Sequence, residues 1–447
     1  MSGKLRFVLA VALVSCVGPA GRAYAQITLG RTDDGSLEFF ASGRLGGFVE
    51  VIKGNSLPQA YGPDPNNPGQ LIRVHPVGSD NGITYPGDPA VQPDGSILPG
   101  PLLASRVRSG FLPNIIGFGV HYRLSDRTTL TGYASIWATA ETDSERTFFY
   151  NYPDEREGYV RADGRFGSLL IGRSLSLFSR GSTEIDFLYG HGFGVGSPGG
   201  FETHGPSGGH IGYGVIASVF AAGVVYATPS LAGFQLTAGY YDPATFVGLY
   251  WVRTKLGRPE AELTYDLPPA SRFLRLHLFV DGTFQKLYAS DGPRSANVYG
   301  VAAGGRIEVG RFHLGAAGFY GPGLGVNYAL NGSDAVVDQY HTQQLRKFDG
   351  LYVQGQVVVR QFDFNAGWGI TRVHELEADI DPMYYDPNTG QPAASILKSR
   401  MGISGAVVYH MSPRLHFDVD YFRADIKWWL GEEQVVHTFN AGTTLTW

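Results

Sequence analysis

Apolar and polar residues alternate with a period of two along most of this 447-residue chain. In the last fourteen residues, Phe439 and Leu445 fall on one side, whereas Thr438, Asn440 and Thr444 fall on the other. Successive side chains of a β-strand point to opposite faces, so the pattern predicts strands with one apolar face. No hydrophobic run has sustained helical spacing. The chain is therefore expected to be all-β, with unlike surroundings on the two faces of its sheet.

The connections between the expected strands alternate between very short turns and long polar segments rich in Gly and Pro. This alternation is typical of outer-membrane barrels, which have short periplasmic turns and long external loops. Segment 242–257 is assigned to a loop or a strand top, because a separate strand there would break the even count. Sixteen antiparallel strands then form one transmembrane β-barrel, wide enough to leave an aqueous channel. They lie near 37–53, 114–124, 128–140, 156–165, 168–175, 212–227, 233–241, 258–267, 272–288, 297–309, 311–320, 347–360, 362–372, 398–411, 413–427 and 434–447.

The composition excludes the main alternatives. Only the N-terminus approaches the run of about 20 apolar residues that a membrane helix needs, and the mean hydropathy is −0.08. Aromatic residues make up 13% of the chain, which is too many for a solvated coil. Charged residues make up only 17%, as expected for strands that face lipid. Aromatic residues near strand ends, among them Trp137, Tyr240 and Trp428, are expected in the girdles at the two membrane interfaces.

Residues 1–25 are expected to be a signal peptide. Lys4 and Arg6 precede a short apolar stretch, and an Ala-x-Ala site ends at Ala25. The alternative is lipidation of Cys16, the single cysteine. Removing 1–25 takes away three of 35 basic residues and none of 40 acidic ones, which leaves a net charge of −8. The mature chain, 26–447, is then expected to have no cysteine chemistry and no nucleic-acid partner, and to reside in the cell envelope.

Three motifs carry a resemblance to the general bacterial (Gram-negative) outer-membrane porin family, in its 16-stranded trimeric form. The stretch Phe166–Arg173 is similar to the family's Phe-Gly-x4-Gly-Arg hairpin, and Tyr226–Phe234 looks like its Tyr-x-Ser-Pro-x-Phe-x-Gly-Phe turn, with Thr and Leu as departures. Leu130–Tyr133 resembles the start of its third strand. The C-terminal Trp447 resembles the aromatic assembly signal that the barrel-insertion machinery reads.

The resemblance implies a homotrimer in which a third loop folds into each lumen and brings acidic loop residues opposite basic wall residues. Segment 176–211 has the right position for this constriction loop, and its acids are Glu184, Asp186 and Glu202. Arg173 matches the family's wall arginine. Strand alternation adds the basic candidates Arg44, Arg123 and Arg161. Each acid either lines the pore or holds the loop in shape through hydrogen bonds, and the sequence leaves both roles open.

No metal, cofactor or catalytic site is expected. The spacing of His191, His204 and His210 matches no ligand motif. Calcium binding by Asp379, Asp381 and Asp386 stays an open alternative, although they lack the Asp-x-Asp-x-Asp-Gly arrangement. No nucleophile elbow, phosphate loop or metalloprotease motif is present.

Segment 54–113 is the expected first external loop, and it holds eleven prolines in sixty residues. It is expected to fold over the mouth of the barrel, to grip a neighbouring subunit, or to be disordered, and the sequence does not decide among these.

The expected function is passive diffusion of small hydrophilic solutes and ions through a water-filled outer-membrane channel. The alternative is a channel selective for sugars or anions, and a barrel enzyme or an adhesin is a weaker third. The −8 charge and the acidic third loop predict weak cation preference. The expected partners are the lipid bilayer, lipopolysaccharide and the other subunits of a homotrimer.

Overall fold

The computed structural model describes residues 26–56, 60–63, 71–74, 101–109, 114–138, 154–187, 210–244, 256–268, 273–288, 293–327, 329–330, 345–376, 397–429, 431 and 433–447. The expected signal peptide, Glu202, His191, His204 and the three aspartates of the possible calcium site lie outside these residues. Within them, no helix has the length and apolar character needed to cross a membrane.

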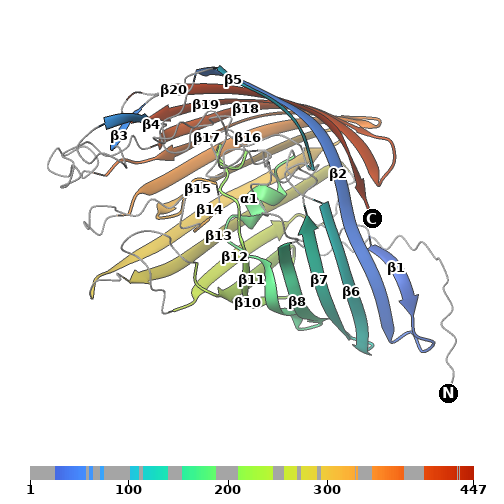
Figure 1. Cartoon of the computed structure of the whole chain (residues 1–447). Coiled ribbons are helices and arrows are strands. Elements are labelled where there is room, and N and C mark those ends of the chain that lie inside the picture. The colour runs from blue at the N-terminus through green and yellow to red at the C-terminus, as the bar shows by residue number, and fades with distance from the viewer. Residues whose placement is uncertain are drawn as a thin grey trace.

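Sixteen antiparallel strands of the described residues form a closed barrel, which confirms the expected fold (Figure 1). Each strand pairs with the next along the chain, and the last pairs with the first, so the sheet has no open edge. Closure satisfies every strand's backbone groups without water, as a membrane requires. The strands are β2 (Leu37–Ser56), β6 (Asn114–Ser125), β7 (Thr128–Ala138), β8 (Asp154–Gly164), β9 (Gly167–Leu175), β10 (Phe220–Ala227), β11 (Phe234–Tyr241), β12 (Arg258–Asp266), β13 (Leu274–Tyr288), β14 (Ser295–Val309), β15 (Phe312–Pro322), β16 (Lys347–Val359), β17 (Phe362–Val373), β18 (Leu397–His410), β19 (Leu415–Trp428) and β20 (Glu433–Thr446).

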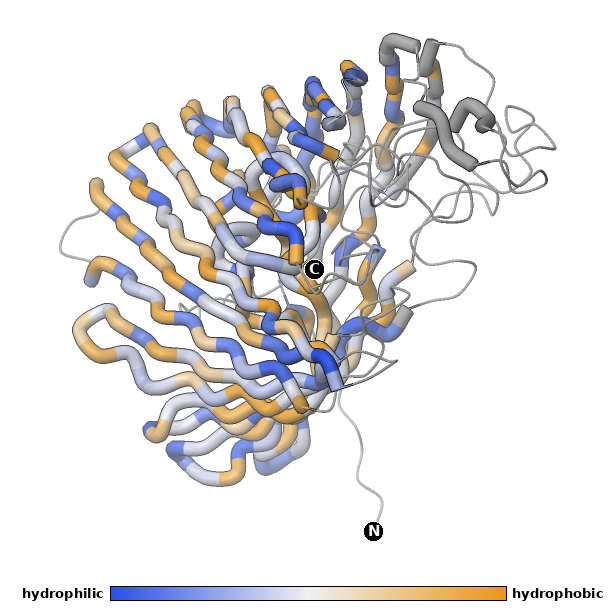
Figure 2. Tube along the Cα trace, turned by 90° about the vertical axis from the view of Figure 1, so that its left-hand side faces the viewer, coloured by the Kyte–Doolittle hydropathy of each residue, from blue (hydrophilic) through white to orange (hydrophobic). Residues whose placement is uncertain are grey.

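The two faces of the barrel differ as the alternation predicts. Val160, Ile171 and Val224 stand side by side on β8, β9 and β10 and are 59%, 56% and 47% exposed on the outer face. The residues that precede and follow each of them along its own strand point inward. Figure 2 shows the resulting alternation of apolar and polar residues along the strands. The outer face is thus suited to lipid over most of the ring.

The aromatic residues expected in the girdles do not all lie on the outer face. Tyr240 is exposed on the outer face, but Trp137 and Trp428 are buried. The ring of Trp137 packs edge-on against Phe220 and lies under the guanidinium of Arg156. Trp428 belongs to an apolar cluster inside the barrel. The expectation was wrong for these two because it used nearness to a strand end and ignored which face the residue occupies.

The segment expected as one long loop, 54–113, contains three strands: β3 (Ala60–Pro63), β4 (Leu71–Val74) and β5 (Pro101–Arg108). β3 pairs with β4 as a separate hairpin. β5 pairs with β2 from Phe48 to Ser56, whereas β6 pairs with β2 from Leu37 to Arg44. β5 and β6 therefore share one side of β2, because β6 alone is too short to satisfy the long edge of β2.

Gln26, the first described residue, and the C-terminal Trp447 both lie beside β2. β1 (Gln26–Arg31) pairs with β2, with Gln26 opposite Ser42. Trp447 occupies the adjoining position: its backbone N–H donates to the oxygen of Gly43 at 3.0 Å, and its oxygen accepts from the N–H of Gly43 at 2.7 Å. β20 and β1 therefore form one continuous line beside β2, and the C-terminus lies next to β1 and β2 in Figure 1.

The strand expected over 212–227 begins only at Phe220. Gly212 and Gly214 have φ values of +80° and +105°, which strand geometry does not allow. Residues 210–219 instead lie inside the barrel, as do residues 176–187 with the short helix α1 (Arg180–Glu184) (Figure 1). We call residues 176–187 the outgoing limb and residues 210–219 the return limb.

Candidate functional site

Buried acids on the inner wall hold the start of the outgoing limb. The backbone N–H of Phe178 donates to the Glu260 carboxylate on β12 at 2.9 Å, and that of Ser179 donates to Asp281 on β13 at 3.0 Å. The first amides of a helix have no acceptor within the helix. The wall supplies acceptors just where the chain turns into α1. These two carboxylates therefore fix where the limb leaves the wall.

The charged groups of α1 also connect to the wall. Arg180 forms an ion pair with Glu262 on β12, and it lies 3.7 Å from Glu184 within the helix. Glu262 is buried, whereas the side chain of Glu184 keeps 23% of its surface exposed. Glu184 is thus shared between a structural ion pair and the solvent side of the loop.

The end of the outgoing limb is bonded to β16. The Tyr352 hydroxyl donates to the Ser182 oxygen at 2.7 Å. The Gln354 amide contacts the limb twice: it donates to the Ile185 oxygen at 2.7 Å and accepts from the Phe187 N–H at 2.8 Å. Neutral wall groups thereby satisfy loop backbone that would otherwise be buried without partners.

A row of three side chains joins the two limbs to the wall. Asp186 accepts from the His210 N–H at 3.0 Å and lies 3.2 Å from its Nδ1, while Nε2 lies 3.1 Å from the Ser404 hydroxyl on β18. This is the order of bonds found in serine hydrolases. However, Asp186, His210 and Ser404 are only 1%, 0% and 5% exposed. The burial fits a clamp between the limbs and does not fit a nucleophile open to substrate.

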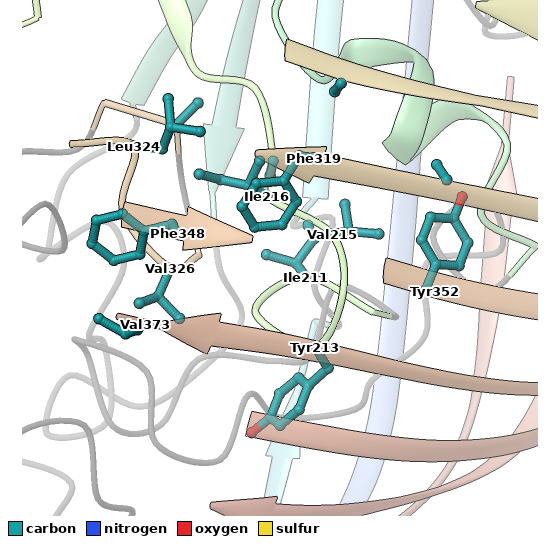
Figure 3. Packing of buried hydrophobic residues seen from close by; sticks show 14 of the residues in the cluster. Ile211, Tyr213, Val215, Ile216, Phe319, Leu324, Val326, Phe348, Tyr352 and Val373 are labelled. Carbon is teal, nitrogen blue, oxygen red and sulfur yellow. The ribbon is translucent and has the colours of Figure 1, made fainter. Parts of the chain in front are cut away.

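The return limb is embedded in an apolar inner wall. Ile211, Tyr213, Val215 and Ile216 are buried in a cluster with wall residues such as Phe348 (Figure 3). Wall glycines make this close approach possible. A Cβ added at Gly369 would lie 1.9 Å from the Tyr213 oxygen, and one at Gly367 would lie 2.5 Å from the His210 ring.

A second segment inside the barrel, residues 323–327 with 329–330, packs against the return limb. Ala217 donates its N–H to the Asn327 oxygen at 2.8 Å, and Ala329 donates to the Ala217 oxygen at 2.8 Å. Arg400 on β18 donates to the Asn327 side chain at 2.8 Å. Leu324 and Val326 join the apolar cluster. The return limb is therefore held between the wall and a second loop.

The basic candidates do not meet the loop acids. Arg173 is exposed on β9, opposite Gly158 and Ala222. Arg44 is buried on β2, where its charge acts on Asp418. Both acids of the described loop have partners on the loop itself, Glu184 in Arg180 and Asp186 in His210.

The remaining candidates lie near the short turns. Arg161 pairs with Asp163 at 2.8 Å, and Arg123 is exposed two residues before the end of β6. Glu202 lies outside the described residues. The described part of the chain holds no group of three or more His, Cys, Asp or Glu side chains placed to bind a metal ion.

Sequence reasoning missed the wall acids that anchor the loop, Glu260, Glu262 and Asp281. A signal was present: all three fall on the inward phase of their strands, where polar residues are expected in a wide barrel. What the pattern lacks is any sign that these acids face loop backbone and not water.

The Gram-negative porin family model matches residues 130–427, two thirds of the chain. The fold resembles that of an anion-selective porin from Comamonas acidovorans, with a TM-score of 0.55, 12% sequence identity, and coverage of 92% of this chain and 100% of that one. It also resembles a loop L8 deletion mutant of OmpT, an outer membrane protein of Vibrio cholerae, with a TM-score of 0.50, 13% identity, and coverage of 92% and 100%. No curated protein sequence matches the chain. On the family match and the closed sixteen-stranded barrel, the chain belongs to the Gram-negative porin family and forms an outer-membrane channel for the passive diffusion of small hydrophilic solutes and ions.

Proposed function

We propose that the outgoing and return limbs narrow the lumen of this diffusion channel and form its constriction. The main support is that the two limbs form hydrogen bonds with inner-wall residues of β12, β13, β16, β17 and β18. These five strands hold the loop inside the lumen. The mature barrel is residues 26–447, after removal of residues 1–25. In this proposal the clamp of Asp186, His210 and Ser404 holds the loop in place, and the burial of its three side chains supports that role.

A graded panel of uncharged sugars tests the constriction. Single-channel conductance in a planar bilayer should fall when the added sugar is small enough to enter and recover above a sharp size limit. A variant that releases the return limb should move that limit to larger sugars. An unchanged limit would contradict the constriction, and an absence of discrete conductance steps from folded protein would contradict the channel itself.

The proposed ion preference is weakly cationic, because the mature charge is −8 and Glu184 keeps an exposed carboxylate. The reversal potential in a salt gradient measures it. Glu184→Gln should reduce the preference, whereas Asp186→Asn should act through the loop because Asp186 is buried. Chloride preference in the wild type, unchanged by both substitutions, would contradict this part of the proposal.

The alternative is a channel selective for anions or sugars. The Comamonas relative is an anion-selective porin, and the apolar packing of two inward segments favours a lumen narrower than a general diffusion pore needs. A reversal potential that favours chloride, or block of the current by micromolar sugar, would select this alternative.

We also propose that the protein assembles as a homotrimer in contact with lipopolysaccharide, and that Trp447 is the signal for barrel insertion. Trp447 supports this role by its place at the seam, where a Cβ added at Gly43 would lie 2.4 Å from the indole ring. Sedimentation of the detergent-solubilised protein tests the trimer. Deletion of Trp447 should strongly reduce the amount of folded protein in the outer membrane, and normal assembly would overturn the role.

A further inference from the structure

Five histidines face the lumen close to the short periplasmic turns. They come from β6, β13, β15, β18 and β19, and we call them the histidine arc: His121, His277, His313, His410 and His416. Each lies within four residues of the turn that ends or begins its strand. The strand register puts them on the inner face, since the residues beside them along each strand, such as Leu278 and Phe417, are exposed on the outer face.

Three members of the arc lie against carboxylates. His277 Nδ1 is 2.8 Å from Asp266, and His410 Nε2 is 2.9 Å from Asp363. His416 stands opposite His410 across the β18–β19 turn, with ring centroids 5.9 Å apart, and its Nε2 is 3.8 Å from Asp418.

The other two members of the arc have neutral hydrogen-bond partners. His313 Nδ1 is 2.5 Å from the Gln356 oxygen, and its ring lies 6.1 Å from that of Phe187 in the outgoing limb. His121 Nδ1 is 2.9 Å from the Thr131 hydroxyl. The contact with Phe187 places His313 beside the outgoing limb, so this member of the arc lies next to the candidate constriction.

Charges of both signs face the arc in nearly equal number. The acids are Glu38, Asp163, Asp266, Glu308, Asp363 and Asp418, and the bases are Arg31, Arg44, Arg123, Arg161, Arg275 and Arg306. Most of these bases are already paired with the acids, such as Arg306 with Glu308 at 3.0 Å. Six acids and six guanidinium groups leave little net charge, so the charge of the five imidazoles decides the sign of the total.

We propose that the histidine arc sets the ion selectivity of the channel according to the pH of the periplasm. Imidazole is the side chain that ordinarily changes charge between about pH 5 and 8. With neutral imidazoles the opposing charges nearly cancel, and the weak cation preference described above remains. With imidazolium the same mouth favours anions, because rings of fixed charge set the preference of a pore. The proposal rests on the open channel and weak cation preference described above.

Reversal potentials in a potassium chloride gradient test the proposal, with all solutions containing a chelator. Between pH 7.5 and pH 5 the ratio of potassium to chloride permeability should fall, on the order of threefold or more at about 0.1 M salt. The fall should be smaller at about 1 M salt, because the screening length shrinks from about 10 Å to about 3 Å. Acidifying only the periplasmic bath, with orientation fixed by an external-loop label, should give most of the shift.

The decisive variant replaces all five members of the arc with Gln. It should keep its conductance and lose most of the pH response, because carboxylates in contact with water titrate mainly below pH 5. His437→Gln is the matched control: His437 faces outward, where its Nδ1 is 2.8 Å from the Tyr421 hydroxyl, and this variant should respond as the wild type does.

If the fivefold variant does not fold, the pair His410→Gln and His416→Gln replaces it and should lose part of the response. A pH response that survives in the variant, or that follows the external bath, would overturn the proposal. Absence of conductance at both pH values in the wild type would instead overturn the channel on which it rests.

Discussion

The lumen has two regions that differ in what the inward-facing residues contact. The loop bed consists of the wall residues that touch the two limbs, and its main members are Glu260, Asp281, Tyr352, Gln354, Gly369, Thr371 and Ser404. Its side chains are buried and bonded to loop backbone. At the periplasmic end, the histidine arc and its charged neighbours are in part exposed and bonded to one another. One region behaves as a protein core and the other as a wetted surface.

Polar residues on the inner face of this barrel therefore have two roles: some bind the backbone of the loop, and others set the charge of the water-filled lumen. In the loop bed, removing one hydrogen-bond partner leaves the other polar group buried and unsatisfied, so a substitution should lower the stability of the protein. At the periplasmic end, water replaces a lost partner, so a substitution should change the field in the pore and leave stability nearly intact.

The largest effect is expected from Gly369→Val in the loop bed. The new side chain would meet the Tyr213 oxygen, and overpacking of this kind typically costs about 1–3 kcal/mol. The return limb should leave the wall, with a lower denaturation midpoint and a larger, noisier single-channel current. Gly355→Ala is the control, because the nearest atom to its added Cβ is 3.6 Å away. Equal behaviour of the two variants would show that the limb does not depend on this contact.

Asp281→Ala should act next most strongly. It leaves the buried N–H of Ser179 without its acceptor, at a cost of about 1–3 kcal/mol. Denaturant unfolding in detergent measures the loss, and open-channel noise reports the freed limb. The comparison is Glu433→Ala, which breaks an exposed pair with Lys427 and should cost less than about 1 kcal/mol. Similar losses of stability in the two variants would show that the loop bed is no more sensitive to substitution than the exposed surface.

Ser404→Ala tests the clamp by removing one hydrogen bond from His210. The expected cost is about 0.5–1.5 kcal/mol, smaller than for Asp281 because a neutral bond is lost. Limited proteolysis of the folded protein should cut the loop faster. Any ester hydrolysis by the wild type that this variant abolishes would refute the structural assignment of the clamp.

At the periplasmic end, Arg161→Gln should leave stability unchanged within about 1 kcal/mol, because its pair with Asp163 is about 40% exposed on both sides. The uncompensated Asp163 should raise cation preference slightly, as a shift in reversal potential. A large loss of stability without a change in selectivity would show that Arg161 acts like the buried residues of the loop bed.

The smallest effect concerns the turn between β1 and β2. The Thr32 hydroxyl and then the Ser36 amide and hydroxyl donate to the Asp34 carboxylate and lower its pKa from 3.8 to about 2. A lowered folded-state pKa means that the carboxylate's contribution is present above pH 4 and is lost as the pH falls through about 2. A carboxyl titration by NMR with its midpoint near 3.8 would contradict these bonds.

The alternation of residues predicted the wall well, because each lipid-facing strand must present an apolar face whatever its neighbours do. The expected strand at 362–372 became Phe362–Val373, and the one at 258–267 became Arg258–Asp266. The exception is the strand expected at 212–227, which joined part of the return limb and β10 into one element. Val215 and Ile216 look like strand residues in a sequence, but the surface that buries them is the inside of the wall.

The site was less predictable than the wall for a physical reason. The sequence names Asp186 as a candidate acid of the constriction loop, but its partner His210 lies 24 residues away and Ser404 lies on a strand of the wall. Glu260 and Asp281 have the same alternation as solvated lumen residues. Only the three-dimensional course of the loop distinguishes a bonded acid from a hydrated one.

The seam between Trp447 and Gly43 has a consequence for biogenesis. The contact that closes the ring joins residues about 400 positions apart, so the entropy of closing that loop must be met before the last pairs form. Until then β2 keeps one unpaired edge that can template the wrong partner. A chain that stops short of β20 leaves that edge open permanently, so closure of the barrel depends on the last strand to be synthesised.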